Sequence, residues 1–148
     1  MNAQAQAELN DALHNVVADM HSATAQLITT LEEEREALLN ADVSGLNCAG
    51  EAKQLLMRRL EHLDEERLHL SSASPKSAAS VQPSWNELLK SLTACKNKNY
   101  QNGTLVGQRL QQVRRALAVL TSNNSDGGTY NHSGTLRGEH RSIPLAEA

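Results

Sequence analysis

The residue types that most often carry chemistry are present in this sequence, but their spacing matches a metal-binding pattern only in part. Glu66 and His69 form an E-x-x-H unit, as in di-iron helical bundles. Such a site needs two of these units and two further inward-facing carboxylates. The sequence has no second unit, and Glu34 is the only other carboxylate that falls on an apolar seam. We therefore expect no metal, no cofactor and no catalytic residue.

Other catalytic and ligand-binding motifs are missing from the sequence. It contains neither a GxSxG nucleophile motif nor a glycine-rich phosphate loop. Cys48 and Cys95 lack metal-ligand spacing and are predicted to be free, partly buried thiols on helices. The basic pairs Arg58-Arg59 and Arg114-Arg115 are offset by acidic runs, and the net charge is −3. We expect no nucleic-acid binding.

The composition favours an all-α fold. Aromatic residues make up 2% of the chain and Phe is absent, which nearly excludes a β-sandwich or barrel core. The abundant residues are strong helix formers such as Leu, Ala, Gln and Glu. No apolar run is long enough to span a membrane, and the first residues lack a secretory signal pattern. We therefore expect a cytoplasmic protein with no membrane insertion.

Heptad spacing of apolar residues predicts long helices over residues 4–41, 44–71 and 84–121. The first two form an antiparallel hairpin, and Asp42 is expected to cap the second. Serines and prolines in residues 71–83 predict a flexible connection, and Ser84 with Glu87 predicts a capping box at the start of the third helix. The expected fold is an elongated antiparallel bundle or coiled coil of three long helices.

The third helix carries the most informative positions. Its seam passes through Asn102-Gly103 without a break, which favours one continuous helix over a hairpin turn there. Asn99 and Asn102 occupy seam positions, where an unpaired amide is costly. Two interpretations remain open: the asparagines select the helix register, or they contact another chain.

The sequence after Leu120 loses its periodicity. Residues 122–148 contain too little apolar surface to order themselves, so they are predicted to be a flexible C-terminal tail with Tyr130 as its only aromatic. The expected domains are a helical domain over 1–121 and this tail. An incomplete bundle of this kind would leave an apolar groove that fits an amphipathic helix of a partner.

Several segments resemble the FlgN-type flagellar export chaperones. The stretch Leu31–Leu39 with Asp42 and Leu46 resembles the family's "L…ER.AL…D…L" pattern, and residues 99–105 resemble its "N..NG.L" motif. The segment from Tyr130 to Gly134 is similar to the family's "YG..G", with Asn131 in place of the usual Gly. The similarity covers about residues 27 to 136.

The resemblance implies a cytosolic type III secretion chaperone without enzymatic activity. Such a protein binds the C-terminal amphipathic segments of hook-associated flagellar proteins, keeps them monomeric and delivers them to the flagellar export gate. The family places client contacts in its C-terminal half, and Tyr130 would contact the export gate or the client. The implied client-binding residues here are Asn99, Asn102, Gly103, Val106, Leu110, Val113 and Leu117.

Two alternatives to an export chaperone follow from the residues themselves. The first is a structural coiled-coil module whose apolar seams are covered by self-association. The second is a di-iron bundle enzyme, which the single E-x-x-H unit makes the weaker of the two.

Overall fold

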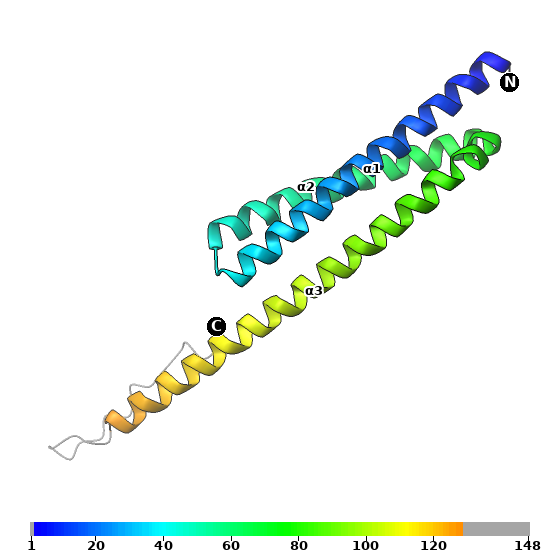
Figure 1. The fold of residues 1–148 in the computed structure, drawn as a ribbon. Helices are drawn as coiled ribbons and strands as arrows, with labels where there is room; N and C mark the ends of the chain where they lie inside the picture. Colours follow the sequence, from blue (N-terminus) through cyan, green and yellow to red (C-terminus); the bar gives the residue numbers. More distant parts are fainter. Residues whose placement is uncertain (1, 129–148) are drawn as a thin grey trace. The chain divides into compact units, whose positions relative to one another are not determined.

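The structure is a computed structural model that describes residues 2–128, with side chains described as far as Asn123. Three helices account for almost all of them: α1 over Ala3–Leu39, α2 over Val43–Ala73 and α3 over Pro75–Gly128 (Figure 1). The described residues contain no strand. The prediction of an all-α fold with three long helices is confirmed.

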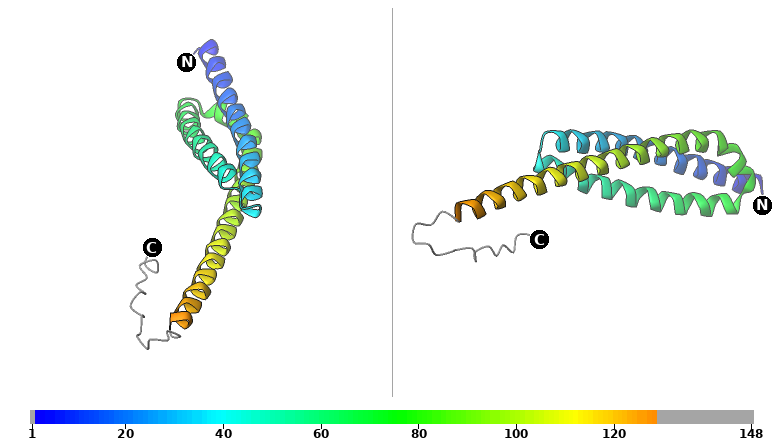
Figure 2. Two further views of the ribbon diagram at one scale, coloured as in Figure 1. Left: turned by 90° about the vertical axis from the view of Figure 1, so that its left-hand side faces the viewer. Right: turned by 90° about the horizontal axis from the view of Figure 1, so that it is seen from below.

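The chain divides into two units, Met1–Leu105 and a second that begins at Val106. In the first unit, α1 and α2 form the predicted antiparallel hairpin, and the first part of α3 runs parallel to α1 (Figures 1 and 2). Hydrogen bonds at both ends of α1 fix this parallel register. Gln6 bonds to Ser77 near the start of α1, and Asn102 bonds to Leu31 O near its end.

Apolar residues at heptad spacing from all three helices form the core of the first unit. The largest cluster joins Val16 and Met20 of α1 to Leu63 of α2 and Leu88 of α3. A second cluster joins α1 to the start of α3, and a third surrounds Cys95; their buried members are Leu13, Val17, Val81, Leu27, Leu31 and Cys95. The core thus continues along α3 from Val81 to Cys95.

The turn between α1 and α2 is a Schellman motif. The Asp42 N–H donates to Ala37 O at 2.9 Å and the Ala41 N–H to Leu38 O at 3.5 Å, which satisfies carbonyls at the end of α1. Asp42 then caps α2, as predicted, because its carboxylate accepts from the Gly45 N–H at 2.9 Å. Gly45 suits this cap because a Cβ there would collide with the Asp42 side chain.

Ala41 has a φ of 53°, the left-handed conformation that favours glycine. Ala41→Gly should therefore raise the free energy of unfolding by about 0.5–1 kcal/mol, since it removes the steric cost of the Cβ. Urea unfolding followed by circular dichroism measures this change. The same substitution at Ala25, an exposed position inside α1, should lower stability by about 1 kcal/mol. Equal destabilisation by both variants would contradict the assigned strain at Ala41.

The flexible connection predicted over residues 71–83 is wrong. α2 continues to Ala73 and α3 begins at Pro75, so Ser74 alone separates the two helices. Ser74 and Ser77 are buried, and their hydroxyls hydrogen-bond to each other and to the Gln6 amide of α1. Pro75 is compatible with a helix because it lies at the first position, where no N–H is needed. The small serines allow a tight corner between the two helices. Their composition alone is also typical of a linker, which is why the prediction failed.

The capping box predicted at Ser84 and Glu87 is also wrong, because both residues lie inside α3. Pro83 is tolerated within the helix. Ser84 contacts α1 instead: its carbonyl and hydroxyl lie 3.0 and 3.2 Å from His21 Nε2. Contacts with α1 therefore hold the segment from Pro75 to Ser84 in helical form, which overrides the local signals in the sequence.

α3 passes through Asn102-Gly103 without interruption, which confirms one continuous helix there. The helix ends at Gly128, beyond the predicted end at residue 121. Residues 129–148, including Tyr130, lie outside the described part of the chain.

Candidate functional site

A buried polar cluster ties the three helices together near the end of the first unit. Glu34 of α1 is only 6% exposed, and Lys53 of α2 lies with its Nζ 2.7 Å from Glu34 Oε2. The Asn102 amide of α3 donates to Leu31 O and to Glu34 Oε1, both at 2.9 Å. Each helix thus contributes one polar side chain to a satisfied network, which fixes the register of the bundle at this level.

The two seam asparagines of α3 have different environments. Asn102 is 2% exposed and its amide N–H groups are used within the bundle, so it fits register selection rather than contact with another chain. Asn99 is exposed, and its side-chain oxygen accepts from Lys53 Nζ at 3.1 Å. Gly103 is exposed and open space surrounds it.

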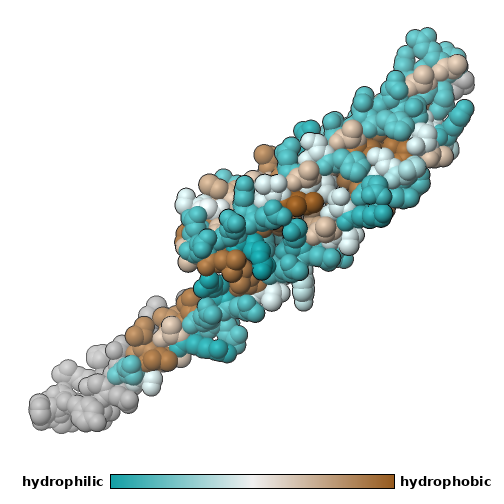
Figure 3. Space-filling view, in the orientation of Figure 1, coloured by the Kyte–Doolittle hydropathy of each residue, from teal (hydrophilic) through white to brown (hydrophobic). Residues whose placement is uncertain are grey.

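The second unit carries an apolar stripe on its helix. Its members are spaced four and three residues apart, which places them on one face: Val106, Leu110, Val113, Leu117 and Leu120. Each of them is between 47% and 60% exposed, and no described residue of α3 after Asn102 is buried. Figure 3 shows apolar surface on this part of α3. We call this set the C-terminal stripe.

The flanks of the C-terminal stripe are basic. Arg109 and Arg114 occupy the positions on either side of the seam, whereas Arg115 lies on the opposite face of the helix. The sequence from residue 106 to 123 contains no acidic residue. A helix with an exposed heptad seam and basic flanks can pair with an amphipathic helix that carries acidic residues beside its own seam.

The predicted client-binding residues therefore fall into two groups. Val106, Leu110, Val113 and Leu117 share one exposed face, whereas Asn102 faces α1 in the first unit. Leu120 was not among the predicted client-binding residues, although its spacing continues the same seam. The contacts of Glu34 with Lys53 and Asn102 were not predicted either, although all three residues occupy seam positions on their helices.

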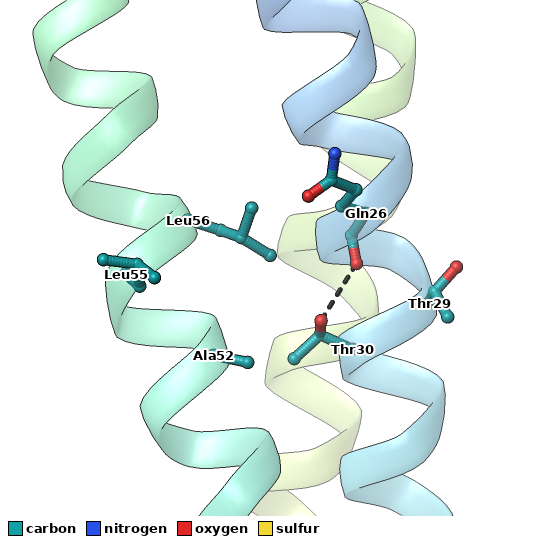
Figure 4. Close-up of a pocket in the computed structure, with 6 residues that line it drawn as sticks. All are labelled: Gln26, Thr29, Thr30, Ala52, Leu55 and Leu56. Atoms are coloured by element: carbon teal, nitrogen blue, oxygen red, sulfur yellow. Dashed lines mark hydrogen bonds between the residues drawn. The ribbon is translucent and has the colours of Figure 1, made fainter.

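A groove between α1 and α2 was not predicted at all. One part, of about 380 Å³, is lined by Gln26, Thr29 and Thr30 of α1 and by Ala52, Leu55 and Leu56 of α2. Figure 4 shows Ala52 and Leu56 pointing toward α1, with α3 passing behind α1. A second part, of about 490 Å³, also includes Ala52 and extends to the hairpin turn. We call the two together the α1–α2 groove.

The two cysteines differ in exposure. Both thiols are free, as predicted, but Cys95 is buried and Cys48 is exposed, whereas the sequence predicted partial burial of both. Burial raises the pKa of the Cys95 thiol, and the nearby positive charge of Lys98 lowers it to a smaller extent. Cys95 is therefore protonated at neutral pH, and its sulfur lies 3.9 Å from Thr24 O.

A thiol-reactive reagent at neutral pH should modify Cys48 rapidly and Cys95 only when the bundle opens, because reaction needs an accessible thiolate. We expect one thiol per chain to react rapidly in the native protein. The second thiol should react only in urea, at the unfolding transition. The variants Cys48→Ser and Cys95→Ser assign the two phases. Rapid reaction of both thiols in the native protein would contradict the buried position of Cys95.

Within residues 2–128, no group of three or more His, Cys, Asp or Glu side chains is arranged to hold a metal ion. No helix in that part of the chain is both long and apolar enough to cross a membrane.

The chain matches a model of a known protein family. The family model described as "FlgN protein" matches residues 1–138, which is most of the chain. No curated protein and no solved structure matches the chain. Because the match includes all three helices and the C-terminal stripe, the chain belongs to the FlgN family of flagellar export chaperones.

Proposed function

We propose that this chain is a cytoplasmic chaperone for hook-associated flagellar proteins and that it binds their C-terminal amphipathic segments along the C-terminal stripe. The observation that carries this proposal is the exposed seam of the second unit. Val106, Leu110 and Leu117 are each almost half exposed although their spacing is that of a buried helix–helix contact. A client helix that covers the seam gains about 0.8 kcal/mol for each buried CH₂.

The same binding mode accounts for the chaperone activity. An amphipathic segment that is disordered in the unassembled client has an apolar face that promotes association with other copies. When the C-terminal stripe covers that face, the client stays monomeric until it reaches the flagellar export gate. Tyr130 is proposed as a contact for the gate or the client, and Asn99 and Gly103 as the exposed residues that border the stripe.

Co-purification tests this function. The full chain should capture an intact hook-associated protein as a complex of defined mass in size-exclusion chromatography with light scattering. A client truncated at its C-terminal segment should not be captured. Failure to capture the intact client would leave the structural self-association module as the better interpretation.

A further inference from the structure

The α1–α2 groove and the C-terminal stripe complement each other in charge. Glu33, Glu36 and Asp42 line the part of the groove nearest the hairpin turn, and neither part of the groove is lined by Lys or Arg. The stripe has the opposite character, since the sequence from 106 to 123 contains three arginines and no acidic residue. Glu33 and Glu36 are both exposed, so their carboxylates are accessible to an incoming helix.

The two surfaces also match in length and in apolar content. The groove follows α1 from Gln26 to Asn40, and the stripe runs from Val106 to Leu120, so each spans about 21 Å at 1.5 Å per residue. The residues that line the groove include the small residues Ala49 and Ala52 and two leucines of α2, of which Leu55 is 63% exposed. Small residues allow a fourth helix to approach closely, and the exposed leucine adds apolar area to the contact.

We propose that the free protein forms a two-fold dimer in which the C-terminal stripe of each copy docks into the α1–α2 groove of the other. Each docking would turn the three helices of a first unit into a four-helix bundle. Each copy supplies one stripe and one groove. Two copies therefore cover both stripes and both grooves, and no docking surface is left for a third copy. Within the described residues, α3 is helical without interruption from Pro75 to Gly128, so the stripe is presented on a continuous helix.

This inference goes beyond the proposed function, because no client takes part. It assigns a second use to the stripe: self-association covers the apolar seam while the protein is free. It also gives the α1–α2 groove a role in dimer formation, although none of the predicted client-binding residues lines that groove.

Size-exclusion chromatography with light scattering on the full chain, without any client, tests the proposal. The wild type should elute as a dimer that dissociates on dilution and at higher salt. Arg114→Glu should raise the dissociation constant about tenfold or more, because it places like charges against the groove. Arg115→Glu is the matched control: it makes the same charge change one residue away, on the opposite face, and should change the constant less than about twofold.

The reciprocal substitution completes the test. Glu33→Arg with Glu36→Arg should weaken the dimer to a similar extent, and combining it with Arg114→Glu should restore most of the affinity. Circular dichroism verifies that each variant is folded. A wild type that is monomeric at all concentrations up to about 100 µM would overturn the proposal. So would equal effects of Arg114→Glu and Arg115→Glu, or a charge-swapped combination no tighter than its parents. Because no client is present, these results are independent of whether the proposed function is correct.

Discussion

Replacement of Leu110 by Asp should abolish client binding while leaving the bundle folded. Leu110 is 49% exposed in the single chain, so the substitution buries no charge within the fold of one copy and costs only the lower helix propensity of Asp, about 0.5 kcal/mol. In the complex the same carboxylate would be desolvated against the client's apolar face without a partner. We expect the affinity to fall about 100-fold or more, which corresponds to about 2.7 kcal/mol. Val106→Asp should behave in the same way.

Two matched variants separate binding from folding. Gln111→Asp introduces the same charge next to Leu110 but on the other face of the helix, and should bind the client almost as the wild type does. Leu88→Asp places the charge at a fully buried position and should unfold the bundle. Circular dichroism melts run beside a pull-down distinguish these cases. A Leu110→Asp protein that is unfolded, or one that is folded and still binds, would contradict the account.

Replacement of Asn102 by Asp, an isosteric change, should strongly destabilise the bundle. The Asn102 amide donates to Leu31 O and to Glu34 Oε1, and an ionised Asp has no proton to donate to either. The new carboxylate would face both a carbonyl oxygen and the Glu34 carboxylate at a position that is 2% exposed. Lys53 compensates only one of the two charges. We expect a loss of about 3 kcal/mol in the free energy of unfolding.

Asn99→Asp is the control for this prediction. It makes the same substitution one helical turn away, where the side chain is exposed and already accepts from Lys53. Its effect on stability should be within about 0.5 kcal/mol. Adding Glu34→Gln to Asn102→Asp should recover part of the loss, because the glutamine amide can donate to the new carboxylate. Urea unfolding measures all four proteins. Equal stabilities of Asn99→Asp and Asn102→Asp would contradict the assigned role of Asn102.

Periodicity predicted the long-range order of this protein well. The heptad seams of α1 and α2 indicated the hairpin, and the seam through Asn102-Gly103 correctly outweighed a local turn signal. These patterns predict well because the heptad spacing reflects which residues are buried along the whole length of a helix. The exposed face of the stripe residues could also be anticipated, since the third seam is longer than the helices available to cover it.

Local composition gave wrong predictions at the corner between α2 and α3. Ser74, Pro75 and Ser77 have the composition of a linker, yet the serines are buried against Gln6 of α1. That contact joins residues about seventy positions apart, so no local window contains it. The α1–α2 groove was missed for a related reason: it depends on how two helices pack side by side, which their separate seams do not specify.

The central claim is that the C-terminal stripe contacts the client, and site-specific photocrosslinking tests it most directly. A photoreactive side chain at Leu110 should crosslink to the C-terminal segment of a bound hook-associated protein. The same group at Arg115, on the opposite face, should give little product. Mass spectrometry of the adduct identifies the client residues involved. Equal crosslinking from both positions, or a Leu110 adduct outside the client's C-terminal segment, would contradict the account.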